Sequence, residues 1–277
     1  MIDIKKSRKA SYELAELDTK QKNDILSKIA ENLDRYRDDI LSANRKDIDK
    51  SRESPLLDRL MLDDRRLDAM IGSIETLITM RDYIGETVEE RVLENGLVLT
   101  ERRAPFGVIA VIYESRPNVT VDVGSLCLKS SSSTILKGGK EASNTNNVLL
   151  RILQDSCAVE YAFQLTSRRD DTYKILSSED IDLVIPRGGG NLIRYVRENS
   201  KVPVIETGEG NCHLYLDKEY ERQQALDIII NAKTQRPSVC NAAETLLIHK
   251  DVPETDIRYI ADALRSEGVE IRGCEMI

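Results

Sequence analysis

A chain of 277 residues can bury a sizeable core, and its length predicts about two domains. Its 40% hydrophobic and 32% charged residues are typical of a globular protein. The net charge of −8 leaves no basic excess to neutralise phosphates, which argues against a general nucleic-acid binder but not against a small anionic substrate.

The cysteines favour a reducing compartment. Five stand far apart, at positions 127, 157, 212, 240 and 274, without the paired spacing of a disulfide framework. Cys212 and His213 are neighbours, but in a strand they point to opposite faces, so we expect no metal site. The first residues lack the apolar segment of a secretory signal, and the longest apolar run, 108–113, is too short to cross a membrane. We therefore expect a cytoplasmic protein with no membrane partner.

Residues 5–80 predict surface helices, because apolar residues recur there at three- and four-residue steps between charged ones. Within this part, Pro55 predicts the start of a further helix that continues through Leu67. At 88–103 the pattern changes to two β-prone segments around Asn95-Gly96. Both residues tolerate the positive φ of a tight hairpin turn, so a two-stranded arm is expected. Its bare edges suggest pairing with another subunit.

From residue 104 onward, short apolar strands alternate with helices. We expect strands at 107–113, 134–137, 159–165 and 181–185, and helices at 118–129, 140–154 and 191–199. Such alternation predicts an α/β fold, with a Rossmann-type parallel sheet and helices on both faces. A second unit follows, with strands at 202–206, 211–217 and 244–249 and helices at 219–232 and 252–267.

Two glycine-containing segments follow predicted strands and are candidates for phosphate contact. In Pro186-Arg-Gly-Gly-Gly190, glycines would let the backbone approach a phosphate at a helix N-terminus, and Arg187 could add a bidentate contact. The segment matches neither the G-x-G-x-x-G pattern nor a P-loop, so a plain turn remains the alternative. In Leu136-Lys-Gly-Gly-Lys140, the two lysines could hold an adenosine ribose and an added phosphate, or could be solvated.

Two further segments could contribute reactive groups. Residues 114–118, Glu-Ser-Arg-Pro-Asn, place hydroxyl, guanidinium and amide groups at a strand end, where they could recognise an oxyanion or phosphate; Asn118 could instead be a helix cap. Residues 231–241, Asn-Ala-Lys-Thr-Gln-Arg-Pro-Ser-Val-Cys-Asn, place Cys240 in a loop beside Arg236. A thiolate near a cation is a candidate nucleophile, although a free cysteine is more often a small buried apolar residue.

Five segments in order resemble the γ-glutamyl phosphate reductases of the aldehyde dehydrogenase superfamily. They are Ala-Pro-Phe-Gly-Val-Ile-Ala-Val-Ile-Tyr-Glu-Ser-Arg-Pro-Asn from 104, Leu-Lys-Gly-Gly-Lys-Glu-Ala from 136, Ile-Pro-Arg-Gly-Gly from 185, Glu-Thr-Gly-Glu-Gly-Asn-Cys-His from 206, and the Cys240 segment from 231. The resemblance covers essentially the whole chain. It implies NADPH-dependent reduction of L-glutamyl 5-phosphate to L-glutamate 5-semialdehyde with release of phosphate, the second step of proline biosynthesis.

The resemblance also implies roles for individual residues. Cys240 matches the nucleophile that forms a thioester, and Ser115 or Asn118 is a candidate oxyanion donor beside the Cys240 N–H. Glu206 aligns with the general base of hydrolytic relatives; since a phosphate-releasing enzyme must avoid hydrolysis, Glu206 is grouped with the expected cofactor residues. The expected NADPH/NADP residues are Lys137, Lys140, Arg187, Gly188, Gly189 and Glu206, and the expected substrate residues are Arg116, Asn211 and Arg236. A cation at Lys140 would favour the extra phosphate of NADP.

By the same resemblance, 1–205 forms an NADP-binding domain with the 85–104 arm inserted, and 206–277 forms the N-terminal portion of a catalytic domain. The family continues for well over a hundred residues past the position matching Ile277, so the second α/β domain is expected to be incomplete. The expected partners are a second copy through the hairpin arm and, as a candidate, glutamate 5-kinase. Two alternatives stay open: a hydrolytic aldehyde dehydrogenase using Glu206 as base, and a truncated, non-catalytic paralogue that binds a nucleotide or a full-length subunit.

Overall fold

The computed structural model describes residues 2–52, 57–206, 210–237 and 239–273. The chain forms two compact units, Met1–Glu206 and Thr207–Ile277. Pro55 and Ser238, and residues 207–209 of the Glu206 segment, lie outside the described residues.

The first unit opens with helices α1 (Ile4–Ala15), α2 (Thr19–Arg35), α3 (Arg37–Lys50), α4 (Leu57–Leu60) and α5 (Asp64–Thr79). Side chains cap several of these helices at the N-terminus; Asp18 and Gln21, for example, form a reciprocal capping box on α2. The helix expected from Pro55 to Leu67 is in fact interrupted. Asp63 accepts the Arg66 N–H and starts α5 as a separate helix.

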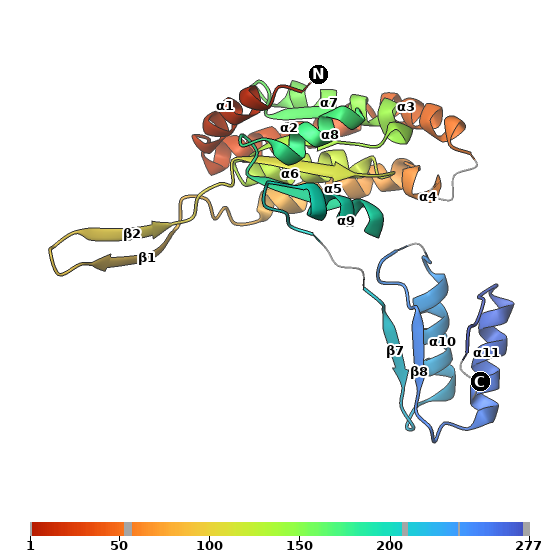
Figure 1. Cartoon of the computed structure of the whole chain (residues 1–277). Helices are drawn as coiled ribbons and strands as arrows, with labels where there is room; N and C mark the ends of the chain where they lie inside the picture. Colours follow the sequence, from red (N-terminus) through yellow and green to blue (C-terminus); the bar gives the residue numbers. More distant parts are fainter. Residues whose placement is uncertain (1, 53–56, 207–209, 238, 274–277) are drawn as a thin grey trace. The chain divides into compact units, whose positions relative to one another are not determined.

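The predicted hairpin is present as β1 (Thr87–Val92) and β2 (Val98–Arg102), an antiparallel pair that extends from the body of the first unit (Figure 1). Every residue of both strands is exposed. Of the two turn residues, Gly96 has a positive φ of 83° and Asn95 does not. Asn95 acts instead through its side chain, which accepts the Leu97 N–H at 3.1 Å.

The body of the first unit is a four-stranded parallel sheet in the order β5-β4-β3-β6. Its elements are β3 (Val108–Tyr113), α6 (Asn118–Lys129), β4 (Ser133–Lys137), the 3₁₀ turn η1 (Lys140–Ala142), α7 (Ser143–Ser156), β5 (Phe163–Thr166), α8 (Arg169–Ser177), β6 (Leu183–Arg187) and α9 (Gly190–Asn199). The order reverses between β3 and β6. In open α/β sheets such a reversal point creates the crevice in which ligands bind, beyond the carboxyl ends of the strands.

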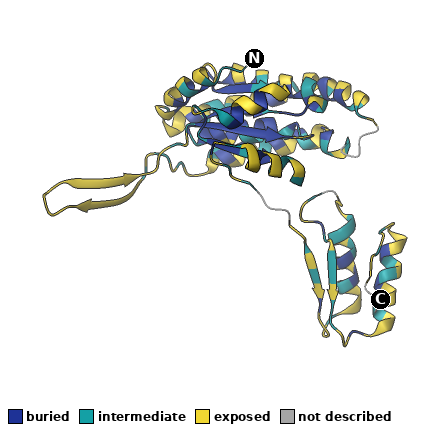
Figure 2. Ribbon diagram, in the orientation of Figure 1, coloured by how far each residue is buried: buried dark blue, intermediate teal, exposed yellow. Residues whose placement is uncertain are grey.

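Helices cover both faces of this sheet, as predicted. On one face of β3, Val108, Ala110 and Ile112 pack with residues of α8 and α9. On the other face, Ile109 and Val111 pack with residues of α6. All six residues of β3 are therefore buried, which explains the uninterrupted apolar run in its sequence (Figure 2).

Several boundaries differ from the sequence prediction. The strand expected at 159–165 begins only at Phe163, because Tyr161 adopts a left-handed turn at φ 62°. The helix expected at 140–154 begins with the 3₁₀ turn η1. Helix α8 was not predicted, and the strand expected at 202–206 is reduced to a single parallel bridge between Val184 and Val204.

The second unit contains β7 (His213–Leu216), α10 (Arg222–Thr234), β8 (Thr245–Ile248) and α11 (Glu254–Ser266). The two strands are parallel, and apolar side chains of all four elements form one core. This is the small second α/β unit that the sequence predicted.

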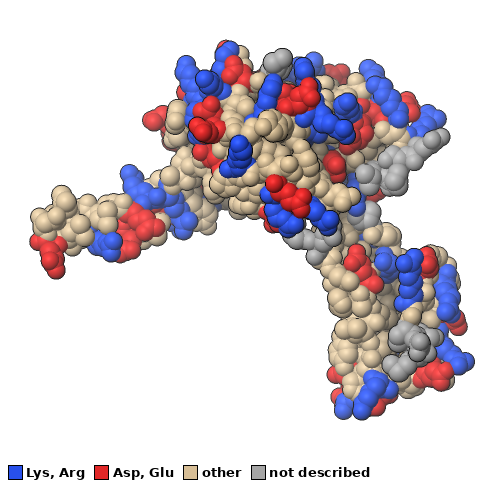
Figure 3. Space-filling model, viewed as in Figure 1, with Lys and Arg blue, Asp and Glu red and all other residues tan. Residues whose placement is uncertain are grey.

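Basic and acidic side chains are interspersed over the face of the chain shown in Figure 3. Within the described ranges, no helix is both long and apolar enough to cross a bilayer. The same residues contain no group of three or more His, Cys, Asp or Glu side chains placed to hold a metal ion.

Candidate active site

The reversal point of the sheet brings together two of the predicted segments. Tyr113, the last residue of β3, pairs with Arg187, the last residue of β6, and the Glu114 N–H donates to the Arg187 carbonyl at 3.3 Å. Residues 114–118 and 186–190 are therefore neighbours at the carboxyl edge. The next strand, β4, ends at Lys137 and leads into the Lys140 segment beside them.

Ser115 is buried and strained at this edge. Its φ of 47° lies in the left-handed region, which a non-glycine residue adopts at a cost of about 1–3 kcal/mol. The N–H and the hydroxyl of Ser115 both donate to one Glu141 oxygen, at 2.7 and 2.9 Å. Glu141 thus holds the turn after β3. Glu141 belongs to the Lys137–Lys140 region of the chain, and its partner is 26 residues away, so no local pattern indicates the contact.

Both predicted oxyanion donors therefore have partners inside the first unit. The donors of Ser115 are directed at Glu141, and the Asn118 side-chain amide donates to Asp122 at 2.8 Å, one turn further along α6. Burial raises the pKa of Asp122, and the Asn118 hydrogen bond opposes that rise.

The glycines after β6 differ in the space around them. A Cβ on Gly188 would lie 2.7 Å from a Glu114 carboxylate oxygen and 2.8 Å from Leu192, so a side chain there would collide. Gly189 is the N-cap of α9 and carries no side-chain cap, and a Cβ on it would meet no atom within 4 Å. The backbone at the start of α9 is therefore open to approach, with the positive end of the helix dipole behind it. Arg187 is exposed next to this position.

Buried side chains lie close to the backbone of the Lys137–Lys140 segment. A Cβ on Gly138 would lie 2.5 Å from the Asn146 amide and 3.1 Å from the Tyr113 hydroxyl, so only glycine fits. Burial raises the pKa of Tyr113. Its hydroxyl is therefore neutral and shares a 2.6 Å hydrogen bond with Thr120. Lys137 is half-buried and Lys140 is exposed, a placement that leaves Lys140 open to a ligand.

Glu206 lies at the end of the first unit. One carboxylate oxygen pairs with Arg197 at 3.3 Å, whereas the other is buried and has no hydrogen-bond partner among the described residues. The expected base thus has a cationic partner from α9.

In the second unit, Cys240 is exposed in the loop between α10 and β8. The loop is anchored where the Ala243 N–H donates to the Ala232 carbonyl at 2.9 Å. Cys212 lies against it, and its thiol donates to the Cys240 carbonyl at 3.3 Å. Asn211 is tied to β8 by a 2.9 Å hydrogen bond from Thr245. Asn211, Cys212 and Cys240 therefore share one end of the β7–β8 pair, while Arg236 is exposed earlier in the same loop.

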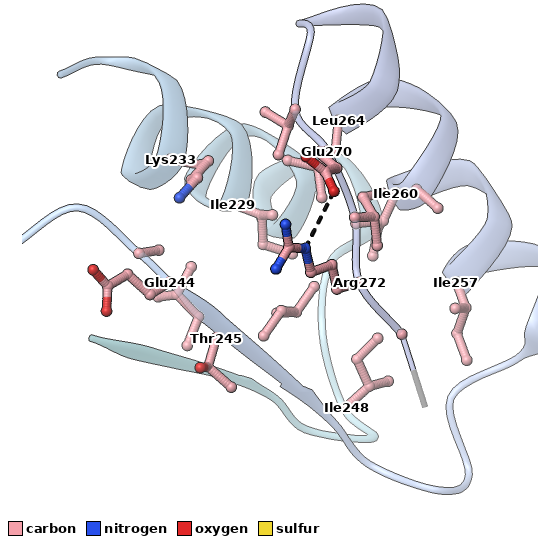
Figure 4. Close-up of a pocket in the computed structure, with 17 residues that line it drawn as sticks. Ile229, Lys233, Glu244, Thr245, Ile248, Ile257, Ile260, Leu264, Glu270 and Arg272 are labelled. Carbon is pink, nitrogen blue, oxygen red and sulfur yellow. Dashed lines mark hydrogen bonds and ion pairs between the residues drawn. The ribbon is translucent and has the colours of Figure 1, made fainter. Parts of the chain in front are cut away.

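The second unit also contains a cavity of about 270 Å³. It is bordered by β7, β8, α10, α11 and residues 269–273, and its lining is mainly aliphatic, with Lys233, Glu244, Glu270 and Arg272 as charged members (Figure 4). None of the predicted catalytic, cofactor or substrate residues lines it.

Comparison with known proteins gives consistent similarities. Residues 3–270 match the aldehyde dehydrogenase family. The chain is 44% identical over 286 aligned residues to γ-glutamyl phosphate reductase of Caldanaerobacter subterraneus, covering 99% of this chain and 69% of that protein. The crystal structure of γ-glutamyl phosphate reductase from Thermotoga maritima superposes with a TM-score of 0.86 at 43% identity, covering 99% of this chain and 69% of that one. At 17% identity, an NADP complex of NADP-dependent glyceraldehyde-3-phosphate dehydrogenase from Bacillus halodurans shares the fold with a TM-score of 0.70, covering 95% of this chain and 56% of that one.

Proposed function

The chain belongs to the aldehyde dehydrogenase family, and within it to the γ-glutamyl phosphate reductases, and from this premise we propose that it reduces L-glutamyl 5-phosphate to L-glutamate 5-semialdehyde with NADPH and releases phosphate. This is the second step of proline biosynthesis. The observation that carries the proposal is the 44% identity, which extends over 99% of the chain and so includes both the sheet edge and the Cys240 loop.

Family membership supports a nicotinamide cofactor, which supplies the hydride when it is bound. In the first unit, the open backbone at Gly189 and the start of α9 would hold the pyrophosphate. Lys137 would contact the adenosine ribose. Lys140, exposed beside it, would pair with the extra phosphate of NADPH and disfavour NADH.

Cys240 would carry out covalent catalysis. Its thiolate attacks the acyl carbon of glutamyl phosphate, a C–S bond forms, and phosphate leaves with the electron pair of the broken C–O bond. Hydride addition to the resulting thioester gives a thiohemiacetal, which releases the aldehyde and restores the thiolate. The exposure of Cys240 supports this role, since a nucleophile must be reachable by its substrate.

The tetrahedral oxyanion would be bound first by the Cys240 N–H. Ser115 and Asn118 are the candidates for a second donor. The Ser115 hydroxyl has one hydrogen and must exchange Glu141 for the oxyanion, whereas the Asn118 amide has two and can keep its bond to Asp122. Arg116 and Arg236 would bind the phosphate or carboxylate of the substrate through their guanidinium groups, and Asn211 would contribute its amide.

We infer a role on the cofactor side for Glu206. One of its carboxylate oxygens pairs with Arg197 of α9 at 3.3 Å, so that oxygen already has a partner within the first unit. Because a reductase that releases phosphate must avoid hydrolysis of its thioester, this role is proposed in place of water activation.

We infer that the hairpin arm pairs two copies of the chain. Val92, Leu97 and Val98 are 69%, 62% and 59% exposed on it, an unusual amount of bare apolar surface on unpaired edges. A cytoplasmic location and coupling to glutamate 5-kinase complete the proposal as expectations.

The test is the reverse reaction in steady state. With glutamate 5-semialdehyde and NADP, the chain should form NADPH only when phosphate or arsenate is present, because one of these must cleave the thioester. Turnover with water alone would identify the hydrolytic alternative. Intact NADPH binding without turnover under any of these conditions would identify the non-catalytic one.

A further inference from the structure

We propose that Cys212 is a resolving thiol for Cys240: once a peroxide oxidises Cys240, the two sulfurs form an intramolecular disulfide. Such a bond would protect the nucleophile from irreversible oxidation. The protective value of the disulfide rests on the proposed role of Cys240, whereas its formation does not.

The contact between the two residues carries the proposal. The Cys212 thiol lies 3.3 Å from the Cys240 carbonyl oxygen. That oxygen is separated from the Cys240 sulfur by only a few covalent bonds. We infer that rotation of the two side chains, with a shift of the Cys240 loop, brings the sulfurs to the bonding distance of about 2.05 Å that a disulfide requires.

The backbone keeps the two residues together. The Cys212 carbonyl accepts the N–H groups of Glu244 and Thr245, at 2.9 and 3.1 Å, at the start of β8. Cys240 is only four residues before Glu244 in the same connection. Their proximity therefore follows from the pairing of β7 with β8 and does not depend on how the two units are arranged.

The other cysteines among the described residues, Cys127 and Cys157, are poorly placed to react with a peroxide or to form a disulfide with Cys240. Burial raises the pKa of Cys127 to about 12 and also raises the pKa of Cys157, so neither forms a thiolate readily. Both are in the core of the first unit. Cys240, by contrast, is exposed, and Cys212 is half-buried.

The disulfide forms in two steps. The Cys240 thiolate attacks a hydroperoxide, takes one oxygen and becomes a sulfenic acid, while the peroxide is reduced to water or an alcohol. The Cys212 thiolate then attacks the Cys240 sulfur, the S–S bond forms, and hydroxide leaves and is protonated to water. Without Cys212, further peroxide converts the sulfenic acid to a sulfinic acid, which a thiol reductant does not reverse.

The experiment treats the purified chain with hydrogen peroxide, blocks the remaining thiols and digests it with trypsin. Cys212, Cys240 and Cys274 fall in separate tryptic peptides, spanning 202–218, 234–250 and 273–277. The expected product joins the first two with the loss of two hydrogens, and dithiothreitol separates them. This readout does not need turnover, so it is independent of the proposed function.

The decisive comparison is Cys212→Ser against Cys157→Ser. Cys212→Ser should lose the crosslink and accumulate Cys240 sulfinic acid, whereas Cys157→Ser should behave like the unmodified chain. If the chain is active, thiol treatment should restore the peroxide-treated parent but not Cys212→Ser. A crosslink from Cys240 to Cys274 in place of Cys212, or equal sulfinic acid in the parent and Cys212→Ser, would overturn the proposal.

Discussion

Removal of the Glu141 carboxylate tests whether the Ser115 turn keeps the carboxyl edge of the sheet in the conformation that binds the cofactor. In Glu141→Ala, the left-handed turn at Ser115 loses the acceptor of both its N–H and its hydroxyl. The turn should then relax toward an ordinary backbone conformation. That change would move the segment which, together with Gly188, borders the reversal point of the sheet.

The expected change in the free energy of unfolding is the difference between two opposing contributions. Hydrogen bonds to a charged group contribute roughly 1.5–3 kcal/mol each, so the two to Glu141 amount to about 3–6 kcal/mol. The positive φ of Ser115 costs about 1–3 kcal/mol, which relaxation recovers. Because Glu141 is only half-buried, the lower end applies, and we expect the free energy of unfolding to fall by about 2 kcal/mol. NADPH binding should weaken about tenfold, equivalent to about 1.4 kcal/mol.

Two measurements check this prediction. Since the chain has no tryptophan, urea unfolding is followed by circular dichroism, and NADPH binding by the fluorescence of the reduced nicotinamide. Glu141→Gln keeps one acceptor oxygen and should lose less than Glu141→Ala in both assays. An unfolding free energy and an NADPH Kd that stay at the parental values in Glu141→Ala would refute the role given to this carboxylate.

Three further predictions concern the nucleophile, cofactor choice and the core. Cys240→Ala should abolish NADPH-dependent reduction while leaving the NADPH Kd near the parental value; substantial residual turnover would remove Cys240 as the nucleophile. Lys140→Glu should raise the Kd of NADPH more than that of NADH in the same fluorescence titration, with Lys140→Gln intermediate, and equal losses would contradict the charge argument. Lys22→Met should cost about 3–5 kcal/mol of unfolding free energy, because it strands the buried Asp82 carboxylate with which Lys22 pairs. Burial opposes ionisation of Asp82, but Lys22 and two further hydrogen bonds lower its pKa overall, so this stabilisation is complete above pH values near 4 and is lost on acidification through the folded-state pKa. Urea melts of the parent should show this loss below pH 4, and melts of Lys22→Met should not.

The parallel sheet was predictable because its strands are buried on both faces, which produces apolar runs such as 108–113. Helix α8 was missed because it is short and polar, and it buries only one side, through residues such as Ile175 and Leu176. The strand at 202–206 looked like its neighbours in sequence. However, only Val204 is bridged to Val184, and pairing depends on neighbours that no local pattern reports.

The sequence points to candidate residues where one residue type carries the chemistry, as for Cys240 and the glycines after β6, and their roles stay predictions. What could not be predicted is which groups already have partners. Ser115 is bound to Glu141 and Asn118 to Asp122, and the contact of Cys212 with Cys240 joins positions 28 residues apart. These contacts arise from the fold and not from local spacing, so the sequence alone could not show them.

The most direct measurement of the central claim is a single-turnover burst in the reverse direction. The chain is mixed with glutamate 5-semialdehyde and NADP in the absence of phosphate, and NADPH is recorded by absorbance. The account predicts a burst of one NADPH per active chain that then stops, a thioester on Cys240 in the intact mass spectrum, and continued turnover once phosphate is added. Steady NADPH formation before phosphate addition, or a burst that persists in Cys240→Ala, would contradict it.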